Sequence, residues 1–298
     1  MEAQGSIRRH LFPLRATEKV LLAFFAYVAV LSLGFPARPL LGYQPWLFFL
    51  IAALAILACS YVAVVRDLLP LALTYLAFRE MELFRPAHFS HHYENIWIHW
   101  DHAVLTYWHG RAAIESLGPV LPEFLELCYL VVYAAGLFGV VTLYILRRRN
   151  DIDRFLLFYV SGTVLAYAFF PFFPSQPPRL LFPGVDPPHY LTWARSLNLW
   201  LLQVGTIHSS VFPSAHVSSA FSAAWGLFRV LPRRKPLAWG FVCYAVCVAV
   251  ATVYGRYHYL ADAVAGFGIS LIAAALIWGL SVRRRRSSAM TKEEVQKF

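Results

Sequence analysis

The sequence predicts an all-α fold: a polytopic bundle of six to eight transmembrane helices. Of the 298 residues, 59% are hydrophobic and 14% are charged, whereas about 25% are charged in an ordinary soluble domain. The mean hydropathy is +0.56, and several apolar runs approach the roughly 20 residues that a spanning helix requires. Short basic clusters border these runs, a pattern typical of loops at a membrane surface.

Eight apolar runs are candidates for these helices. They cover residues 20–34, 46–65, 68–84, 123–146, 155–173, 212–231, 237–254 and 259–282. Neighbouring helices can bury their polar faces against one another, so we expect one membrane domain over residues 1–298. Its expected parts are the N-terminal helices within 1–150, an interfacial segment at 85–122, a core at 155–282 and a basic cytoplasmic tail at 283–298.

The basic residues indicate the orientation of the helices. The formal net charge of +10 would suit a nucleic-acid partner, but the positive charges sit in short clusters beside apolar runs and not along one face. By the positive-inside rule these clusters face the cytoplasm, and both termini lie there too. The clusters are Arg8, Arg9, Arg15 and Lys19, then Arg147–Arg149, Arg233–Lys235 and Arg283–Arg286.

Alternation of basic and neutral loops places two segments on the same, non-cytoplasmic face. The run 155–173 leads outward from the basic cluster 147–149, so the loop 174–211 lies outside. The runs 212–231 and 237–254 then form a hairpin, which brings the turn 254–259 to that face as well. For 68–84, which contains Pro70 and ends beside Arg79 and Glu80, a span and a re-entrant segment both stay open.

The cysteines and the N-terminus indicate no further processing or metal chemistry. Cys59, Cys128, Cys243 and Cys247 all fall inside apolar runs, where cysteine commonly acts as a small buried hydrophobe. We therefore expect no disulfide framework and no zinc site. No small-residue cleavage site follows the first apolar run, so we interpret it as a membrane helix and not as a removed signal peptide.

The turn between the last two apolar runs carries the strongest functional signal. Ionisable residues are costly in a membrane setting, which makes Arg256, His258 and Asp262 candidates for a functional site. His258 and Asp262 are four residues apart and so share a helix face. An aspartate that accepts from one imidazole nitrogen fixes the tautomer and makes the other nitrogen a better base or nucleophile. A purely structural pair that ties a helix end to a loop is the alternative.

A second candidate is Ser214 with His216, at the predicted start of the helix 212–231. Ser214 is a natural N-cap, and free N–H groups at a helix N-terminus attract anions. The imidazole of His216 beside them could donate a proton to a leaving oxygen. Because the following hairpin returns His258 to the same membrane face, the two histidines can meet.

A third candidate is Arg179, in the proline-rich stretch 174–181 of the external loop. The prolines stiffen the chain where it leaves the membrane, and a guanidinium matches the geometry of phosphate oxygens. Alone, such an arginine is more often anchored to lipid headgroups. With Arg256 close by in the expected fold, an oxyanion site is the preferred interpretation.

These segments resemble a known family. Pro213-Ser214-Ala215-His216, and His258-Tyr259-Leu260-Ala261-Asp262 followed by Ala263-Val264-Ala265-Gly266, are similar to the second and third signatures of the type-2 phosphatidic acid phosphatase superfamily. The resemblance covers roughly residues 155–282 and is closest to the branch containing inositol-phosphorylceramide synthases, whose first signature resembles Pro177-Pro178-Arg179. It implies that His258 attacks phosphorus, that Asp262 orients it and that His216 protonates the leaving group, without a metal ion or other cofactor.

The chain departs from the family pattern at three places. The first signature usually has a lysine several residues before its arginine, and residues 165–178 contain none. The third usually has an arginine six residues before the nucleophile, where this chain has Thr252, and Ala215 replaces a usual glycine. Missing cations favour a phosphotransferase over hydrolysis of a dianionic monoester, and Arg256 is a candidate replacement.

A histidine-rich stretch at 88–109 holds six of the eleven histidines. Trp97, Trp100, Tyr107 and Trp108 interleave with them, which favours an amphipathic helix in the membrane interface. A lid or acceptor-binding role and a metal site are the alternatives. Asp101 is the residue of this stretch that we expect to contact substrate.

The preferred hypothesis is a phosphotransfer enzyme that acts on a membrane lipid phosphate ester or diester through a phosphohistidine. The expected catalytic residues are His258, His216 and Asp262, and the expected substrate-binding residues are Arg179, Arg256, Ser214 and Asp101. A polyol or lipid hydroxyl as acceptor makes the enzyme a headgroup transferase, and water makes it a lipid phosphate or polyprenyl diphosphate phosphatase. Alternatives of other classes are a transporter or channel and an inactive lipid-binding member of the family.

Overall fold

The protein was examined as a computed structural model, which describes residues 13–35 and 42–295. All the regular structure in these residues is helical. The α-helices are α1 (Ala16–Ser32), α2 (Gln44–Cys59), α3 (Ala63–Glu80), α4 (His92–His102), α5 (Gly110–Glu115), α6 (Val120–Val131), α7 (Ala135–Ile145), α8 (Ile152–Tyr167), α9 (Pro178–Leu181), α10 (Trp193–Gly205), α11 (Ala215–Val230), α12 (Lys235–Tyr254) and α13 (Leu260–Val295). A π-helical segment, Ala103–Tyr107, lies between α4 and α5.

Four segments of the described chain are long and apolar enough to cross a membrane. They are Val120–Ile145, Arg149–Phe172, Lys235–Tyr254 and Leu260–Ser281. The protein is therefore an all-helical integral membrane protein. Helices α1, α2 and α11, with 17, 16 and 16 residues, fall short of the roughly 20 that a span requires, so any spans beyond four remain a prediction.

The segment 68–84, whose topology the sequence left open, continues α3 up to Glu80 and ends in a 3₁₀ turn, Met81–Phe84. Helix α3 begins at Ala63, five residues before the apolar run at 68, and contains Pro70 in its interior. Its first two turns include Arg66 and Asp67, which are both buried and pair with Glu18 and Arg149 elsewhere in the chain. The polar start of α3 is thus explained by ion pairs within the protein.

Helix α11 occupies the centre of the bundle and packs closely on α8, α12 and α13. Small residues make this possible: a Cβ at Gly162 of α8 would lie 1.9 Å from Oγ of Ser222 on α11. The hydroxyl of Ser218 donates to the carbonyl of Gly162 at 2.8 Å. Small residues let helix backbones approach and form interhelical hydrogen bonds, as is common in membranes.

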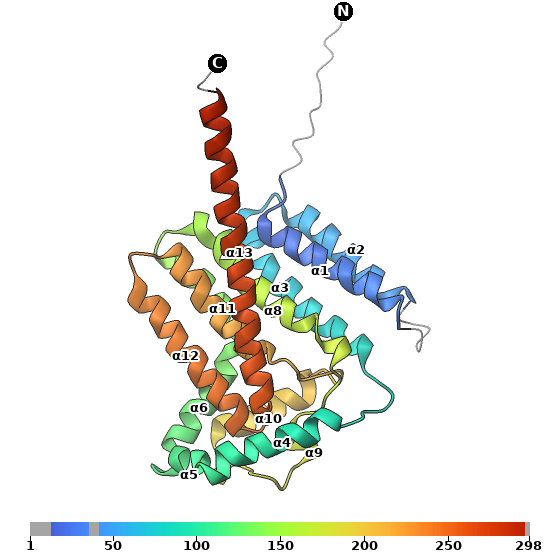
Figure 1. Cartoon of the computed structure of the whole chain (residues 1–298), viewed down its shortest axis with the longest axis vertical. Coiled ribbons are helices and arrows are strands. Elements are labelled where there is room, and N and C mark those ends of the chain that lie inside the picture. Colours follow the sequence, from blue (N-terminus) through green and yellow to red (C-terminus); the bar gives the residue numbers. More distant parts are fainter. Residues whose placement is uncertain (1–12, 36–41, 296–298) are drawn as a thin grey trace, which may run out of the picture.

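Three of the four basic clusters meet at one end of the bundle. Arg15 and Arg149 both pair with the buried carboxylate of Asp67, at 2.7 Å each, and Arg148 donates to the carbonyl of Val230 at the end of α11. Helix α13 begins at the opposite end and runs past this one (Figure 1). The side chains of Arg8, Arg9 and Arg283–Arg286 lie outside the described part of the chain.

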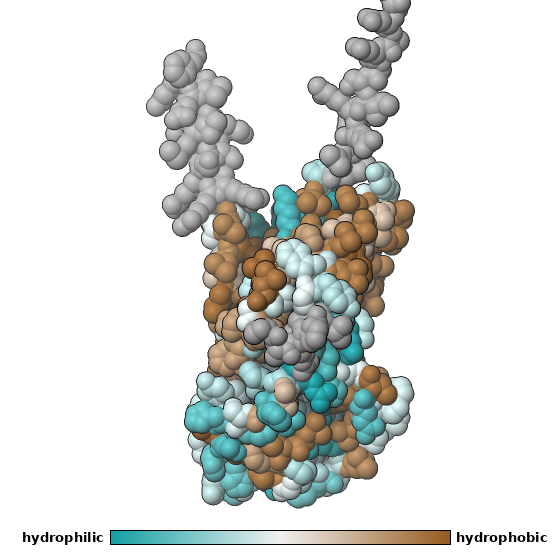
Figure 2. Space-filling model, turned by 90° about the vertical axis from the view of Figure 1, so that its right-hand side faces the viewer, coloured by the Kyte–Doolittle hydropathy of each residue, from teal (hydrophilic) through white to brown (hydrophobic). Residues whose placement is uncertain are grey.

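The opposite end is covered by the segments that link the long helices. Helix α4 crosses this end at a steep angle to α13, with α9 and α10 beside it (Figure 1). On the face turned toward the viewer in Figure 2, hydrophobic side chains gather over the upper part and hydrophilic ones at this lower end. The interfacial segment predicted at 85–122 therefore lies across one end of the bundle, and the predicted loop 174–211 contains two helices, α9 and α10.

Candidate active site

The turn between α12 and α13 is held tightly by backbone hydrogen bonds. The carbonyl of Thr252 accepts from the N–H groups of both Tyr257, at 2.9 Å, and His258, at 3.0 Å. Arg256 adopts a positive φ of 62° to close the turn. Thr252 stands where the family resemblance predicts an arginine, and it is fully buried. Its role in this structure is to anchor the turn that carries His258.

His258 and Asp262 form the predicted hydrogen bond across one turn of helix. Nδ1 of His258 lies 3.2 Å from Oδ2 of Asp262, and the same oxygen accepts from the N–H of Tyr259 at 3.0 Å. His258 is only 6% exposed. Burial, and after it the positive charge of Arg179, lower the pKa of His258 to about 3. The imidazole is therefore neutral near pH 7, as a nitrogen nucleophile must be.

Ser214 begins α11, as the sequence predicts, and joins α11 to α13. Its hydroxyl accepts from the N–H of Val217 at 3.4 Å, the bond of an N-cap. Its own N–H donates to the carbonyl of Asp262 at 3.0 Å. Gly266 permits this contact, because a Cβ there would lie 2.4 Å from the Ser214 carbonyl oxygen. Ser214 thus fixes the two histidine-bearing segments to each other.

His216 and His258 lie next to each other at this junction, with their ring planes tilted by 60°. Their ring centroids are 5.4 Å apart, and His216 is stacked on Tyr129 at 5.1 Å, with Tyr133 against its edge. Nε2 of His216 is buried and has no hydrogen-bond partner among the described residues. A buried imidazole nitrogen without a partner is costly, so this atom is available to a bound ligand.

Arg179 reaches the same place from α9. Its N–H donates to the carbonyl of Arg256 at 3.1 Å, and its guanidinium lies 5.7 Å from the ring centroid of Tyr257. Burial lowers the pKa of Arg179, and no carboxylate of the described chain pairs with it. The structure places Arg179 in the lining of the same cavity as His216 and His258.

Arg195 also belongs to this region, and sequence reasoning missed it. It lies on α10, with its guanidinium 5.7 Å from the ring centroid of Tyr257, and it pairs with Glu126 at 2.8 Å. The sequence predicts a loop over residues 174–211, whereas the structure has α10 there. The signal that could have revealed α10 is Thr192, whose side chain caps the helix by accepting from the N–H of Arg195.

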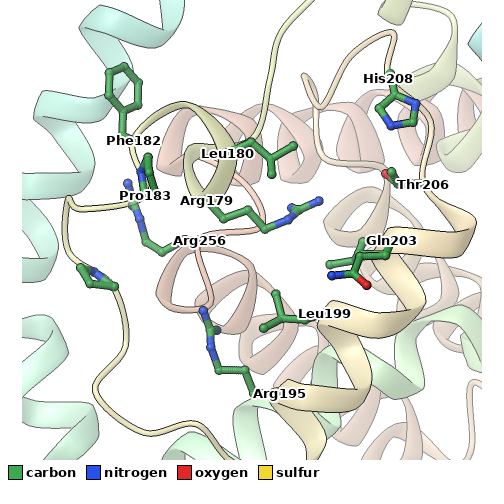
Figure 3. A pocket seen from close by; sticks show the side chains of 12 residues that line it. Arg179, Leu180, Phe182, Pro183, Arg195, Leu199, Gln203, Thr206, His208 and Arg256 are labelled. Carbon is green, nitrogen blue, oxygen red and sulfur yellow. The ribbon is translucent and has the colours of Figure 1, made fainter.

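Arg256 does not face the histidines. Figure 3 shows its side chain pointing away from that of Arg179, on the far side of the short α9 turn. Its Nη1 pairs with Oδ2 of Asp101 at 2.6 Å, while Nε and Nη2 have no partner among the described residues. The expected juxtaposition of the Arg179 and Arg256 guanidiniums in one oxyanion site is therefore not observed.

Asp101 contacts protein groups on all the sides that the structure describes. It is fully buried, and its second carboxylate oxygen accepts from the N–H of Leu260, the first residue of α13, at 2.8 Å. Burial raises the pKa of Asp101 to about 6, against the lowering effect of Arg256. Asp101 lines neither of the two cavities at this end, so its observed contacts are with the turn and not with an open site.

One face of α4 contacts all three motif segments. Glu94 accepts from the N–H of Gln176 in the proline-rich stretch at 3.1 Å. Trp97 stacks on Phe212, two residues before Ser214, with ring centroids 5.0 Å apart, and Asp101 binds the turn after α12. The spacings of three and four residues keep these side chains on one buried helix face.

Comparison with known proteins decides the family. The sequence profile of the PAP2 superfamily matches residues 94–276. The chain belongs to the PAP2 superfamily. The matched region begins at Glu94, so it includes α4 as well as the three motif segments. A PA-phosphatase related-family protein from Dictyostelium discoideum is 29% identical over 119 residues, which cover 34% of this chain and 20% of that relative. No solved structure shows a significant match.

Two cavities meet at Arg179 in this PAP2 protein. The larger, about 760 Å³, contains both histidines and extends between α3, α7 and α8 along apolar side chains. These include Leu71, Phe78, Leu137 and Tyr167. The smaller, about 420 Å³, is lined by Arg179, Arg195, Arg256, Gln203 and Thr206, with His208 at its edge (Figure 3). Apolar side chains, among them Leu180, Phe182 and Leu199, also line the smaller cavity, but its three arginines make it the more cationic of the two.

The histidine-rich stretch forms surface contacts in this PAP2 protein. His102 pairs with Asp186 at 2.8 Å, and His91 with Glu94 at 3.3 Å. Within residues 13–35 and 42–295, no three His, Cys, Asp or Glu side chains are grouped closely enough to hold a metal ion. The four cysteines are free, and Cys243 is exposed on α12, so its prediction as a buried hydrophobe was wrong.

Proposed function

We propose that this protein transfers a phosphoryl or phosphodiester group of a membrane lipid through a phosphohistidine at His258. The observation that carries the proposal is the meeting of a neutral His258, oriented by Asp262, with the unpartnered Nε2 of His216. Arg179 lies beside both, and no carboxylate of the described chain compensates its charge. The nucleophile, the proton donor and the cation of the proposed reaction are thus present, and a phosphate ester would supply the leaving group.

In the proposed first half-reaction, Nε2 of His258 attacks phosphorus. The P–N bond forms as the P–O bond to the leaving group breaks, and the imidazolium of His216 gives its proton to the leaving oxygen. Burial, and after it the charges of His258 and Arg179, lower the pKa of His216 to about 3 in the free protein. In this proposal His216 takes up its proton as the phosphate binds, because the negative charge of the phosphate favours the imidazolium. In the second half, His216 removes a proton from the acceptor hydroxyl, whose oxygen attacks phosphorus and releases His258.

Arg179 is the proposed ligand of the non-bridging oxygens. Of the three arginines around the smaller cavity, Arg256 is compensated by Asp101 and Arg195 by Glu126. Only an uncompensated cation adds net attraction for an anion in a buried site. The stacking of Arg179 near Tyr257 holds its planar fork in place before the substrate arrives.

The cavity arms support a lipid substrate and a polar acceptor. The apolar arm of the larger cavity suits an acyl or prenyl chain, with the phosphate at Arg179 and the histidines. The smaller cavity offers amide, hydroxyl and guanidinium donors next to Arg179 and is large enough for a polyol. A separate chamber with these donors favours an acceptor alcohol and headgroup transfer, as in the inositol-phosphorylceramide synthase-like branch. Water as acceptor, giving a lipid phosphatase, is the second candidate.

Asp101, Arg256 and Ser214 act in this proposal as positioning residues. Ser214 holds α11 on α13, and the Asp101–Arg256 pair holds the turn of His258 on α4. None of the three touches the proposed phosphate site. A transporter, by contrast, would carry ionisable groups near the middle of its spans, whereas the ion pairs described here gather at the two ends of the bundle.

We propose that the site lies on the non-cytoplasmic face and the termini in the cytoplasm, because the basic clusters meet at the opposite end. A cysteine introduced at Leu191, which is 74% exposed, tests this in a Cys243→Ser background. A reagent that cannot cross the membrane should label it in intact cells. Labelling only after the cells are broken would show that position 191 and the site face the cytoplasm.

The test of function is turnover of labelled lipid phosphates, lipid diphosphates and phospholipids by purified protein, with and without inositol or glycerol. His258→Ala should abolish turnover and the acid-labile protein-bound phosphate of a phosphohistidine. His99→Ala, which changes an exposed histidine of α4, is the matched control. Turnover by His258→Ala equal to that of the native protein would overturn the nucleophile assignment, and product identity separates transfer from hydrolysis.

A further inference from the structure

A third cavity lies away from the candidate active site, between α1, α8 and α13. Its volume is about 1020 Å³. Helix α8 packs against both α1 and α13, and the groove runs along α8 between them, from Asp153 to Phe172. Its length corresponds to most of α8, and none of its lining residues belongs to the two cavities at the histidines.

The walls of this groove are apolar along most of its length. Phe24, Leu157, Phe158 and Leu276 line it, and Leu276 is 60% exposed. Such a surface is not filled by other parts of the described chain. In a bilayer we expect hydrocarbon chains to fill the groove, because contact between its apolar walls and water is unfavourable.

The end of the groove at the basic pole of the bundle is cationic. Lys19, Arg154 and Arg229 line this end, together with Asp153. The carboxylate of Asp153 is already engaged, since its oxygens accept from the N–H groups of Ala16 and Thr17 at the start of α1. The lining therefore presents net positive charge to whatever occupies the groove.

These three cations have little compensation from carboxylates. Arg154 has a long contact of 3.3 Å with Asp151 and is more than half exposed, so this pair contributes little. Among the described residues, no carboxylate pairs with Lys19 or Arg229. Three side chains from three different helices, α1, α8 and α11, thus converge on one end of an apolar groove.

From this charge complementarity we infer that the groove binds an anionic phospholipid. Its phosphate lies at Lys19, Arg154 and Arg229, and its acyl chains follow the walls toward Phe158 and Leu276. Arginine and lysine are the usual partners of lipid phosphates at a membrane surface. The site belongs to the leaflet opposite the histidines, so the bound lipid is a structural ligand and not the substrate. It ties α1 to the α8–α13 pair.

The proposal is tested by thermal unfolding of the full-length protein in a nonionic detergent, with added phosphatidylglycerol or phosphatidylcholine. Ligand that binds only the folded state raises Tm. Phosphatidylglycerol should raise Tm and phosphatidylcholine should not. Glycerol phosphate, which has the charge but no acyl chains, should leave Tm unchanged in Arg179→Gln, which lacks the cation of the proposed phosphate site. Equal shifts with both phospholipids, or a shift with glycerol phosphate in Arg179→Gln, would overturn the proposal.

Two sets of variants locate the binding site. Each cation near a lipid phosphate is worth about fivefold in affinity, so Lys19→Gln/Arg154→Gln/Arg229→Gln should weaken the phosphatidylglycerol response by about a hundredfold. Arg233→Gln/Arg234→Gln removes exposed charge outside the groove and should leave the response intact. Equal losses in both sets would show attraction to surface charge alone and contradict the groove.

The active site is a competing location for the same lipid and needs its own control. Arg179→Gln should retain the Tm shift, whereas binding in the histidine cavity would abolish it. Native mass spectrometry should find phosphatidylglycerol retained by the native chain and lost from the triple variant. A native chain that forms dimers without retained lipid would assign the groove to a second copy and overturn the proposal. None of these outcomes depends on the proposed catalytic function.

Discussion

Asp101 and Arg256, 155 residues apart in sequence, form a buried ion pair of 2.6 Å that holds the turn of His258 against α4. The other oxygen of Asp101 binds the first N–H of α13. The same helix contacts the two other motif segments through Glu94 and Trp97. Helix α4 thus sets the relative position of the three segments that form the proposed phosphate site.

Asp101→Asn should lower kcat about a hundredfold with little change in KM, because a displacement of about 1 Å at a reacting atom is enough for such a loss. The double variant Asp101→Asn/Arg256→Gln removes both charges of the pair, and its change in stability should differ from the sum of the changes in the single variants because the two residues interact. Steady-state kinetics and denaturant unfolding measure the two effects. A change confined to KM would indicate a substrate ligand instead.

The pH dependence of kcat should report Asp101. Its pKa is raised to about 6, so the carboxylate pairs with Arg256 above this pH and is neutral below it. With the pKa of His258 at about 3, the nucleophile stays neutral between pH 4 and 8. Activity should therefore fall as the pH drops through about 6, and Asp101→Asn should remove this acid limb.

The same residue predicts the opposite trend for stability. Its pKa in the folded state lies above the ordinary value of 3.8, so the folded state takes up the proton first as the pH falls from about 6 to about 4. Uptake by the folded state raises the contribution of Asp101 to stability in that window. Between pH 6 and pH 4, activity should thus fall while the protonation of Asp101 causes no fall in Tm. An acid limb unchanged in Asp101→Asn would assign it elsewhere.

Experiments that detect the phosphorylated protein should distinguish the role of His258 from that of Asp262. His258→Ala removes the nucleophile and should give neither turnover nor phosphorylated protein. Asp262→Asn keeps the shape but loses the carboxylate that orients the ring, and a loss of roughly 10³- to 10⁴-fold in kcat is expected. Acid-labile label should still accumulate slowly in Asp262→Asn. Rapid labelling at native rate would make the pair structural.

Much of the fold and of the site could be predicted because the relevant signals are local. Hydropathy and short basic clusters indicate a membrane bundle and the end at which the basic loops meet. The four-residue spacing of His258 and Asp262 and the capping sequence at Ser214 each describe one helical turn, and both are confirmed. The hairpin of α11 and α12 then brings His216 to His258.

The remaining contacts could not be predicted because they join distant segments without a periodic pattern. Arg256 adjoins His258 in sequence, but its positive φ turns its side chain away, toward Asp101. Arg195 lies on a helix in a region that looked like a loop, and its partner Glu126 is on α6. Which arginine keeps a free charge depends on these carboxylates, and only the assembled structure supplies them.

Arg179 and Arg195 should differ in their response to charge removal. Arg179→Gln removes the uncompensated cation of the proposed phosphate site, and kcat/KM should fall about 10²- to 10³-fold. Arg195→Lys keeps a charge for Glu126 and should lose far less, with the effect confined to packing on Tyr257. Kinetics on a lipid phosphate and unfolding curves for both variants provide the comparison. Similar losses in kcat/KM would place both arginines on the phosphate.

Gly266→Ala tests whether the close contact of α11 and α13 positions the histidines. The new Cβ would lie 2.4 Å from the Ser214 carbonyl oxygen, a backbone atom that cannot rotate away. The helices must separate, at a cost of about 1–3 kcal/mol, and the distance between His216 and His258 must increase. Gly268→Ala, two residues further along α13 with open space at its Cβ, is the matched control. We expect kcat to fall at least tenfold in Gly266→Ala and to stay near native in Gly268→Ala. Native kcat in Gly266→Ala would show that proton transfer does not depend on this junction.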